Sequence, residues 1–179
     1  MLSALSLPSM SLVSSNAIAT ESGSTKIIAV TEDICQDTRA FAANLPVSLI
    51  DTDPASMMLH IASGFENQDF EIAYGLTRDS NMMLIEQYAQ QFGYSLQYHG
   101  IHSYAKGRLL HEITASNELL GKLEKQLTEK PSDWVTTISR VPVLTTRHSQ
   151  KLLNEAISTT HAIPSDGTGQ LVSWMFTRA

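Results

Sequence analysis

The chain has 179 residues and a formal net charge of −6, from 12 Lys and Arg against 18 Asp and Glu. Its basic residues are scattered singly from Lys26 to Arg178, so no clustered positive surface is expected, which excludes nucleic acid and disfavours acidic lipid as partners. The length and the 42% hydrophobic content allow one ordinary core or two small ones sharing an interface, and exclude a large multidomain enzyme.

The N-terminal segment indicates the cellular compartment in which the protein acts. Its first twenty residues carry no charge and end in Ala17-Ile18-Ala19, the small-residue pattern of a signal-peptidase site. No basic residue precedes the apolar part, as expected if Met1 is an internal methionine of a longer leader. Residues 1–25 are therefore interpreted as a signal peptide of a periplasmic or otherwise exported protein, or else as the disordered N-terminus of a cytoplasmic one. No other stretch approaches the roughly 20 apolar residues of a membrane span, so no integral membrane segment is predicted.

The next predicted unit, residues 26–68, combines a strand with helices. Residues 27–30 are an apolar run typical of a strand, and Thr31 is a candidate N-cap for a helix that continues to Ala43. A second helix is expected from Ser56. This unit is interpreted as a small α/β unit at the start of the folded part.

Residues 69–147 contain the clearest periodic patterns. Residues 70–76 alternate between apolar and small or polar side chains, which predicts a half-buried strand. A helix with one apolar face follows and should end at Gly93, a natural C-cap. The remaining elements predicted here are strands at 94–98 and 108–114, an irregular connection between Gly100 and Gly107, a Leu-rich helix at 116–127, and strands at 134–141 and 143–146.

A partial internal repeat accompanies this alternation of helices and strands. Met57-Met58-Leu59 and Met82-Met83-Leu84 lie 25 residues apart, and Gly75 and Gly100 keep the same spacing. The spacing indicates a recurring helix–strand unit, with coincidence among helix starts as the alternative. The predicted fold class is α+β, with repeated helix–strand units forming small mixed sheets and helices packed on one face.

The order strand, helix, strand, strand, helix, strand, strand in residues 70–146 resembles the short N-terminal domain of secretins and TonB-dependent receptors, called STN. The resemblance is carried by residues 84–98, where the helix ends in Gln91-Phe92-Gly93 and leads into a strand, and by the polar-headed, Leu-rich second helix, residues 116–127. It implies a module that binds protein through sheet edges and helix faces, in an accessory component of a secretion, conjugation or type IV pilus machine.

The last unit, residues 148–179, is predicted as a helix followed by a strand. The inward face of the helix is predicted to consist of Leu152, Leu153, Ala156 and Ile157. Residues 166–169 are predicted as a turn and residues 170–177 as the strand. Because this strand is largely apolar, it is either buried on both faces or exposed until a partner covers it.

The residue types that carry chemistry form no recognisable motif. His99 and His102 are the closest histidine pair, but a metal would need a third ligand from afar, such as His111 or Glu112. Cys35 is the only cysteine, which excludes an intramolecular disulfide, and no Gly-x-Ser-x-Gly sequence is present. We therefore predict no catalytic residue, no metal site and no cofactor.

The function predicted from these observations is a noncatalytic periplasmic component of a cell-envelope assembly that acts through contacts with a protein partner. A homo-oligomer is compatible with the sequence. The first alternative is a small enzyme or ligand-binding protein, which would require a deep apolar pocket. Its weak ligand-site candidates are Tyr98, His99, His102, Arg108 and Glu112. The second alternative is an immunity or inhibitor protein with one tight cognate partner.

Overall fold

The structure, a computed structural model, describes residues 25–45, 54–105, 108–145, 151–159 and 169–178. The leader-like segment up to residue 24 and most of the predicted turn at 166–169 lie outside these ranges. The strands are β1 (Ile27–Thr31), β2 (Ile72–Thr77), β3 (Tyr94–Ala105), β4 (Arg108–Ser116), β5 (Leu152–Thr159) and β6 (Gln170–Arg178). The helices are α1 (Gln36–Ala43), α2 (Pro54–Asn67), α3 (Asp79–Gln91), α4 (Asn117–Glu129), α5 (Trp134–Ser139) and α6 (Val141–Leu144), with the short 3-10 helix η1 (Pro131–Asp133) before α5.

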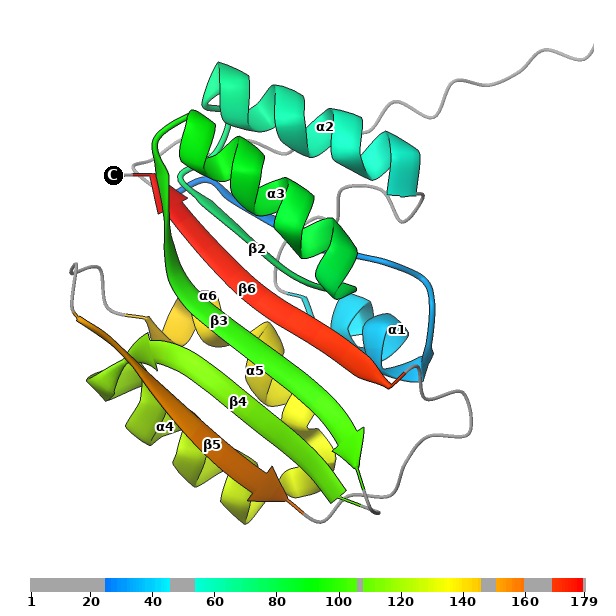
Figure 1. Ribbon diagram of the computed structural model, residues 1–179, viewed down its shortest axis with the longest axis vertical. Coiled ribbons are helices and arrows are strands. Elements are labelled where there is room, and N and C mark those ends of the chain that lie inside the picture. Colours follow the sequence, from blue (N-terminus) through cyan, green and yellow to red (C-terminus); the bar gives the residue numbers. More distant parts are fainter. Residues whose placement is uncertain (1–24, 46–53, 106–107, 146–150, 160–168, 179) are drawn as a thin grey trace, which may run out of the picture.

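The six strands form one mixed sheet in the order β1-β2-β6-β3-β4-β5. β1 and β2 are parallel, and every other neighbouring pair is antiparallel. The last strand, β6, lies between β2 and β3, so all three units predicted from the sequence contribute strands to a single sheet (Figure 1). The carboxyl ends of β1, β2, β3 and β5 consequently share one edge of the sheet, with the starts of β4 and β6.

Helices cover both faces of this sheet. Figure 1 shows α2 and α3 side by side on one face, with α4, α5 and α6 behind the other. The side chains of α2 and α3 pack with one set of strand residues into a core that includes Met57, Phe65 and Trp174. Those of α1, α4, α5 and α6 pack with the opposite strand faces into a second core that includes Phe41 and Leu123. The α+β class is confirmed, with one sheet and two helical layers where small sheets covered on one face were expected.

The two central strands explain how the cores are separated. Every residue of β2 is buried, and so are residues 171–176 of β6. Along β6, Leu171 and Met175 enter the core of α1, α4 and α5, whereas Val172 and Phe176 enter the core of α2 and α3. The C-terminal strand is therefore a core strand buried on both faces, the first of the two interpretations drawn from its sequence.

Four local predictions were wrong. Thr31, predicted as the N-cap of the first helix, is the last residue of β1, and α1 begins after the N-cap Cys35. Residues 134–139 and 141–144, which fall in the two segments predicted as strands, are helical in α5 and α6, because Trp134, Val135 and Ile138 bury one helical side against the sheet and packing overrides strand propensity. The segment around Leu152, Leu153 and Ile157, predicted as a helix, is β5, an edge strand that buries only Ile157 and Thr159. The connection predicted after Gly100 is instead the continuation of β3 to residue 105.

The 25-residue spacing has a structural counterpart in two successive helix–strand units, α2 with β2 and α3 with β3. Met57 and Met82, near the starts of the two helices, both enter the same core. Gly75 and Gly100, in the two strands, flank β6 and lie opposite its neighbouring residues Trp174 and Ser173. The repeated residues thus occupy equivalent positions on either side of the last strand.

Candidate functional site

The five ligand-site candidates are divided between the two faces of the sheet. Tyr98 and His102 point from β3 into the core beneath α5, where both are buried. His99 lies on the opposite face, where Glu86 and Asp79 of α3 are close enough to influence its pKa. Glu112 is exposed on the strand beside it, paired with Ile101. Because side chains alternate along a strand, the structure brings Tyr98 and His102 together and keeps His99 and Glu112 apart from them.

The fifth candidate, Arg108, is exposed at the start of β4 and pairs in register with Ala105. It shares the even-numbered side of β4 with Glu112, opposite the buried side that carries Leu109. The candidates therefore do not converge on one site.

A chain of buried polar side chains crosses β4, β3 and β6. His102 Nδ1 lies 2.7 Å from His111 Nδ1, and His102 Nε2 lies 2.6 Å from Ser173 Oγ. Ser173 Oγ in turn lies 2.7 Å from the hydroxyl of Tyr98. All four side chains are buried. We call Tyr98, Ser173, His102 and His111 the polar chain. The sequence analysis did not include Ser173 among the candidates, although a serine within an otherwise apolar strand could have indicated a buried polar contact.

Glycine 100 makes room for the polar chain. A Cβ at this position would lie 2.7 Å from both Ser173 Oγ and the Tyr98 hydroxyl. Burial lowers the pKa of His102 well below its ordinary value, and His111 lowers it further. Burial also raises the pKa of Tyr98. Burial thus favours the neutral forms of Tyr98 and His102 inside the core.

The order serine, histidine, histidine is that of a nucleophile, a base and an orienting group. A substrate would nevertheless need space at Ser173, which is completely buried. A depression lined by residues that include His102, Tyr104 and Trp134 is too narrow to admit a water molecule. The described residues therefore offer no room for a substrate beside the serine.

The depression has polar walls. The Tyr104 hydroxyl donates a hydrogen bond of 3.1 Å to Asp37, a buried residue in the first turn of α1. Burial and the Asp37 carboxylate raise the pKa of Tyr104. The Trp134 indole N–H approaches the Tyr104 hydroxyl but makes no hydrogen bond of normal geometry within the described ranges. These contacts join α1, α5 and the end of β3.

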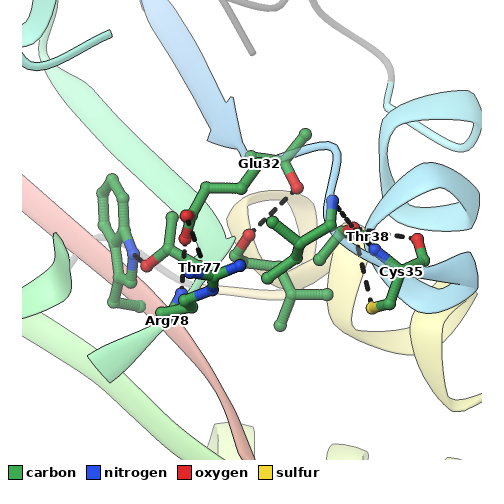
Figure 2. A network of polar contacts seen from close by, with 9 residues as sticks. Glu32, Cys35, Thr38, Thr77 and Arg78 are labelled. Atoms are coloured by element: carbon green, nitrogen blue, oxygen red, sulfur yellow. Dashed lines mark hydrogen bonds and ion pairs between the residues drawn. The ribbon is translucent and has the colours of Figure 1, made fainter. Parts of the chain in front are cut away.

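A second polar network joins the ends of β1 and β2 to the start of α3 (Figure 2). The Glu32 side chain is 2% exposed and accepts a hydrogen bond of 2.6 Å from the backbone N–H of Arg78, the N-cap residue of α3. Thr31 donates to the carbonyl of Leu76, and Trp174 donates to the hydroxyl of Thr77. Glu32 therefore supplies the acceptor at a helix start whose own N-cap side chain makes no capping bond.

Replacing Glu32 by alanine is expected to lower the free energy of unfolding by about 1–3 kcal/mol, because the Arg78 N–H loses a charged acceptor. The matched control is Asp33→Ala, since Asp33 is exposed and its ion pair with Arg39 is worth about 0–1 kcal/mol. Urea denaturation of both variants measures the difference. Equal losses would show that Glu32 does not hold the start of α3.

The outer surface of the α2 and α3 layer carries apolar side chains. Four of them are exposed: Leu59 at 73%, Met83 at 56%, Leu84 at 45% and Tyr88 at 38%. Together they are called the α2–α3 face. The 14 residues of α2 and the 13 of α3 include no Lys or Arg. Glu66, Asp79 and Glu86 give these helices a negative charge.

Three residues of the α2–α3 face lie on α3, and one of them, Met83, is on the same side of this helix as Asp79 and Glu86. Asp79 and Glu86 mark the side of α3 that faces His99 on β3. Leu84 and Tyr88, one helical turn apart, lie on the other side, toward α2, which packs against α3. Leu59 projects outward from α2, away from the buried Met57 and Ile61. Leu84 and Tyr88 therefore expose apolar side chains on the side of α3 next to α2, while Leu59 is exposed on the outer side of α2.

Other site types lack support in the described ranges. No described helix is long and apolar enough to cross a membrane. Among the same residues, no group of three or more His, Cys, Asp or Glu is placed to hold a metal ion.

No family model matches the chain, and comparison with curated proteins and solved structures gives no significant match.

Proposed function

We propose that the protein is a noncatalytic binding component that receives an amphipathic helix of a partner protein on its α2–α3 face. The observation that carries this proposal is the group of four exposed apolar side chains on two adjacent helices. Contiguous apolar surface rimmed by polar residues marks interaction sites, and an amphipathic helix is the usual occupant of a junction between two helices.

The charge of the α2 and α3 layer favours a basic partner. With Glu66, Asp79 and Glu86 near the apolar residues and no Lys or Arg on either helix, lysines or arginines beside the partner's apolar face would find complementary charge. A second copy of this chain would instead bring two acidic layers together, so we assign the face to a different protein.

The leader-like pattern that ends at Ala19 supports a further part of the proposal, namely that the protein acts outside the cytoplasm in a cell-envelope assembly of the secretion, conjugation or pilus type. The first five elements of the STN resemblance, which correspond to β2, α3, β3, β4 and α4, support the same setting, whereas its last two predicted strands are helices. Recovery of the full-length protein only from the cytoplasmic fraction of its cells would contradict this part.

Replacing Leu84 by glutamate is expected to weaken the complex at least about tenfold, because a charge would enter an apolar contact and add to an acidic surface. The matched control is Val143→Glu, which places the same charge at a 72% exposed apolar residue of α6, in the other helical layer. Size-exclusion chromatography of the tagged variants from the producing cells measures complex formation. Loss of the complex in both variants, or in neither, would contradict the assignment to the α2–α3 face.

A further inference from the structure

The centre of the polar chain is a pair of titratable side chains with almost no access to water. His102 is 1% exposed and His111 is completely buried. The indole of Trp134, the first residue of α5, covers both rings, at centroid distances of 4.8 Å from His102 and 5.5 Å from His111. A single short helix therefore closes the core over two imidazoles.

The hydrogen-bond distances require the two imidazoles to share one proton between their Nδ1 atoms. Two neutral rings 2.7 Å apart satisfy this when one Nδ1 donates and the other accepts. A first added proton places a positive charge in an apolar interior, which is costly. A second added proton leaves two Nδ1–H donors facing each other. The arrangement is thus compatible with a neutral pair and unfavourable for a charged one.

The other groups around the pair offer His102 little compensation. From α1, Asp37 lines the same depression, but its carboxylate accepts the hydrogen bond from Tyr104 of β3. Cys35, which precedes α1, is buried nearby, and His99 on the far face of β3 disfavours a positive His102. From the neighbouring strands, Ile157 of β5 pairs with His111 and Ser173 of β6 hydrogen-bonds His102, and neither carries a charge.

We propose that the His102–His111 pair is a proton-sensitive latch that holds α5 against the sheet. While both imidazoles are neutral, Trp134 stays packed on them. When the solution is acid enough to protonate them, α5 opens, because the rings can then reach water. α5 has only six residues and lies between α1 and α4, so its opening breaks contacts with these two helices but requires less disruption than unfolding of the sheet.

The direction of the pH effect follows from linkage. The folded pKa of His102 lies well below 6.5, whereas the opened or unfolded chain binds a proton near that value. Stability from the closed latch is therefore fully present above about pH 6.5 and is lost as the pH falls below it. Below about pH 6.5, the equilibrium constant for closing α5 decreases about tenfold per pH unit for each histidine that the closed state keeps neutral.

Hydrogen exchange of the full chain at pH 7.5 and pH 5.5, corrected for intrinsic exchange rates, tests the latch. We expect protection of the α5 amides to fall about tenfold or more relative to the amides of α3, which packs on the opposite face. Equal changes in the two helices would mean that the fold opens as a whole, and no change in α5 would mean that the pair does not respond. Either result overturns the proposal.

Variants separate the histidine pair from other acid-sensitive groups. His102→Gln keeps hydrogen-bonding capacity but does not titrate. Its α5 amides should therefore lose about tenfold less protection per pH unit of acidification than the α5 amides of the wild-type protein. The matched control is His60→Gln on the exposed side of α2, which should retain the full loss. If His102→Gln does not fold, NMR titration of the wild-type imidazoles replaces it, and a His102 that titrates in the ordinary range for histidine would refute the latch.

Discussion

Replacing Trp134 by alanine is expected to lower the free energy of unfolding by about 3–5 kcal/mol, the cost of removing a large buried aromatic side chain. Trp134 is 1% exposed and packs on both His102 and His111. Its removal would leave a cavity over two neutral imidazoles that cannot be protonated cheaply. Urea denaturation near pH 7.5 measures the loss.

Trp134→Phe is the matched control for this prediction. Because the Trp134 indole N–H makes no hydrogen bond of normal geometry in the described structure, phenylalanine loses volume without leaving a polar partner unsatisfied. We expect its loss to be less than half that of Trp134→Ala. Equal losses in the two variants would show that the N–H group contributes through a hydrogen bond.

Replacing Gly75 by alanine is expected to lower the free energy of unfolding by about 2–3 kcal/mol through overpacking. A Cβ at this position of β2 would collide with the backbone carbonyl of Val30 on β1 and would lie 2.6 Å from the ring of Trp174. A carbonyl held in the sheet cannot move aside cheaply, so β1 or the Trp174 ring must shift. Thermal or urea denaturation measures the effect.

Gly121→Ala is the matched control, because the same chemical change is expected to raise the free energy of unfolding there instead of lowering it. A Cβ at Gly121, on the exposed side of α4, meets no atom within 4 Å. Alanine should therefore raise stability by about 0.5–1 kcal/mol through its higher helix propensity. Destabilisation of both variants by similar amounts would contradict the steric explanation for Gly75.

Elements with strong local periodicity were predicted well from the sequence. The helices at α3 and α4 have one apolar face and clear boundaries, with Gly93 after the first and Ser116 as the N-cap of the second, where its hydroxyl accepts from the N–H of Leu119. The strand β2 was likewise predicted, but as a half-buried strand, whereas all of its residues are buried. Short segments failed, since the bulky residues of α5 and the paired leucines of β5 suit either structure until tertiary packing decides.

Long-range pairing limited what the sequence revealed about the polar side chains. Tyr98 and His102 were identified as candidates, but their common partner Ser173 is 71 residues from His102 along the chain. His99 was grouped with them because it is close in sequence, although strand alternation sends it to the opposite face. The exposed positions of Leu84 and Tyr88 could be read from helical spacing, whereas the neighbouring position of α2 depended on the topology of the sheet.

Site-specific photo-crosslinking in the producing cells tests the proposed function most directly. A photoreactive amino acid is placed at Leu84, and at Val143 as the control, and the crosslinked peptide is identified by mass spectrometry. We predict one crosslinked product from position 84 only, to an apolar segment flanked by Lys or Arg in another protein. A crosslink to a second copy of this chain, a crosslinked segment without basic residues, or equal crosslinking from both positions would contradict the account.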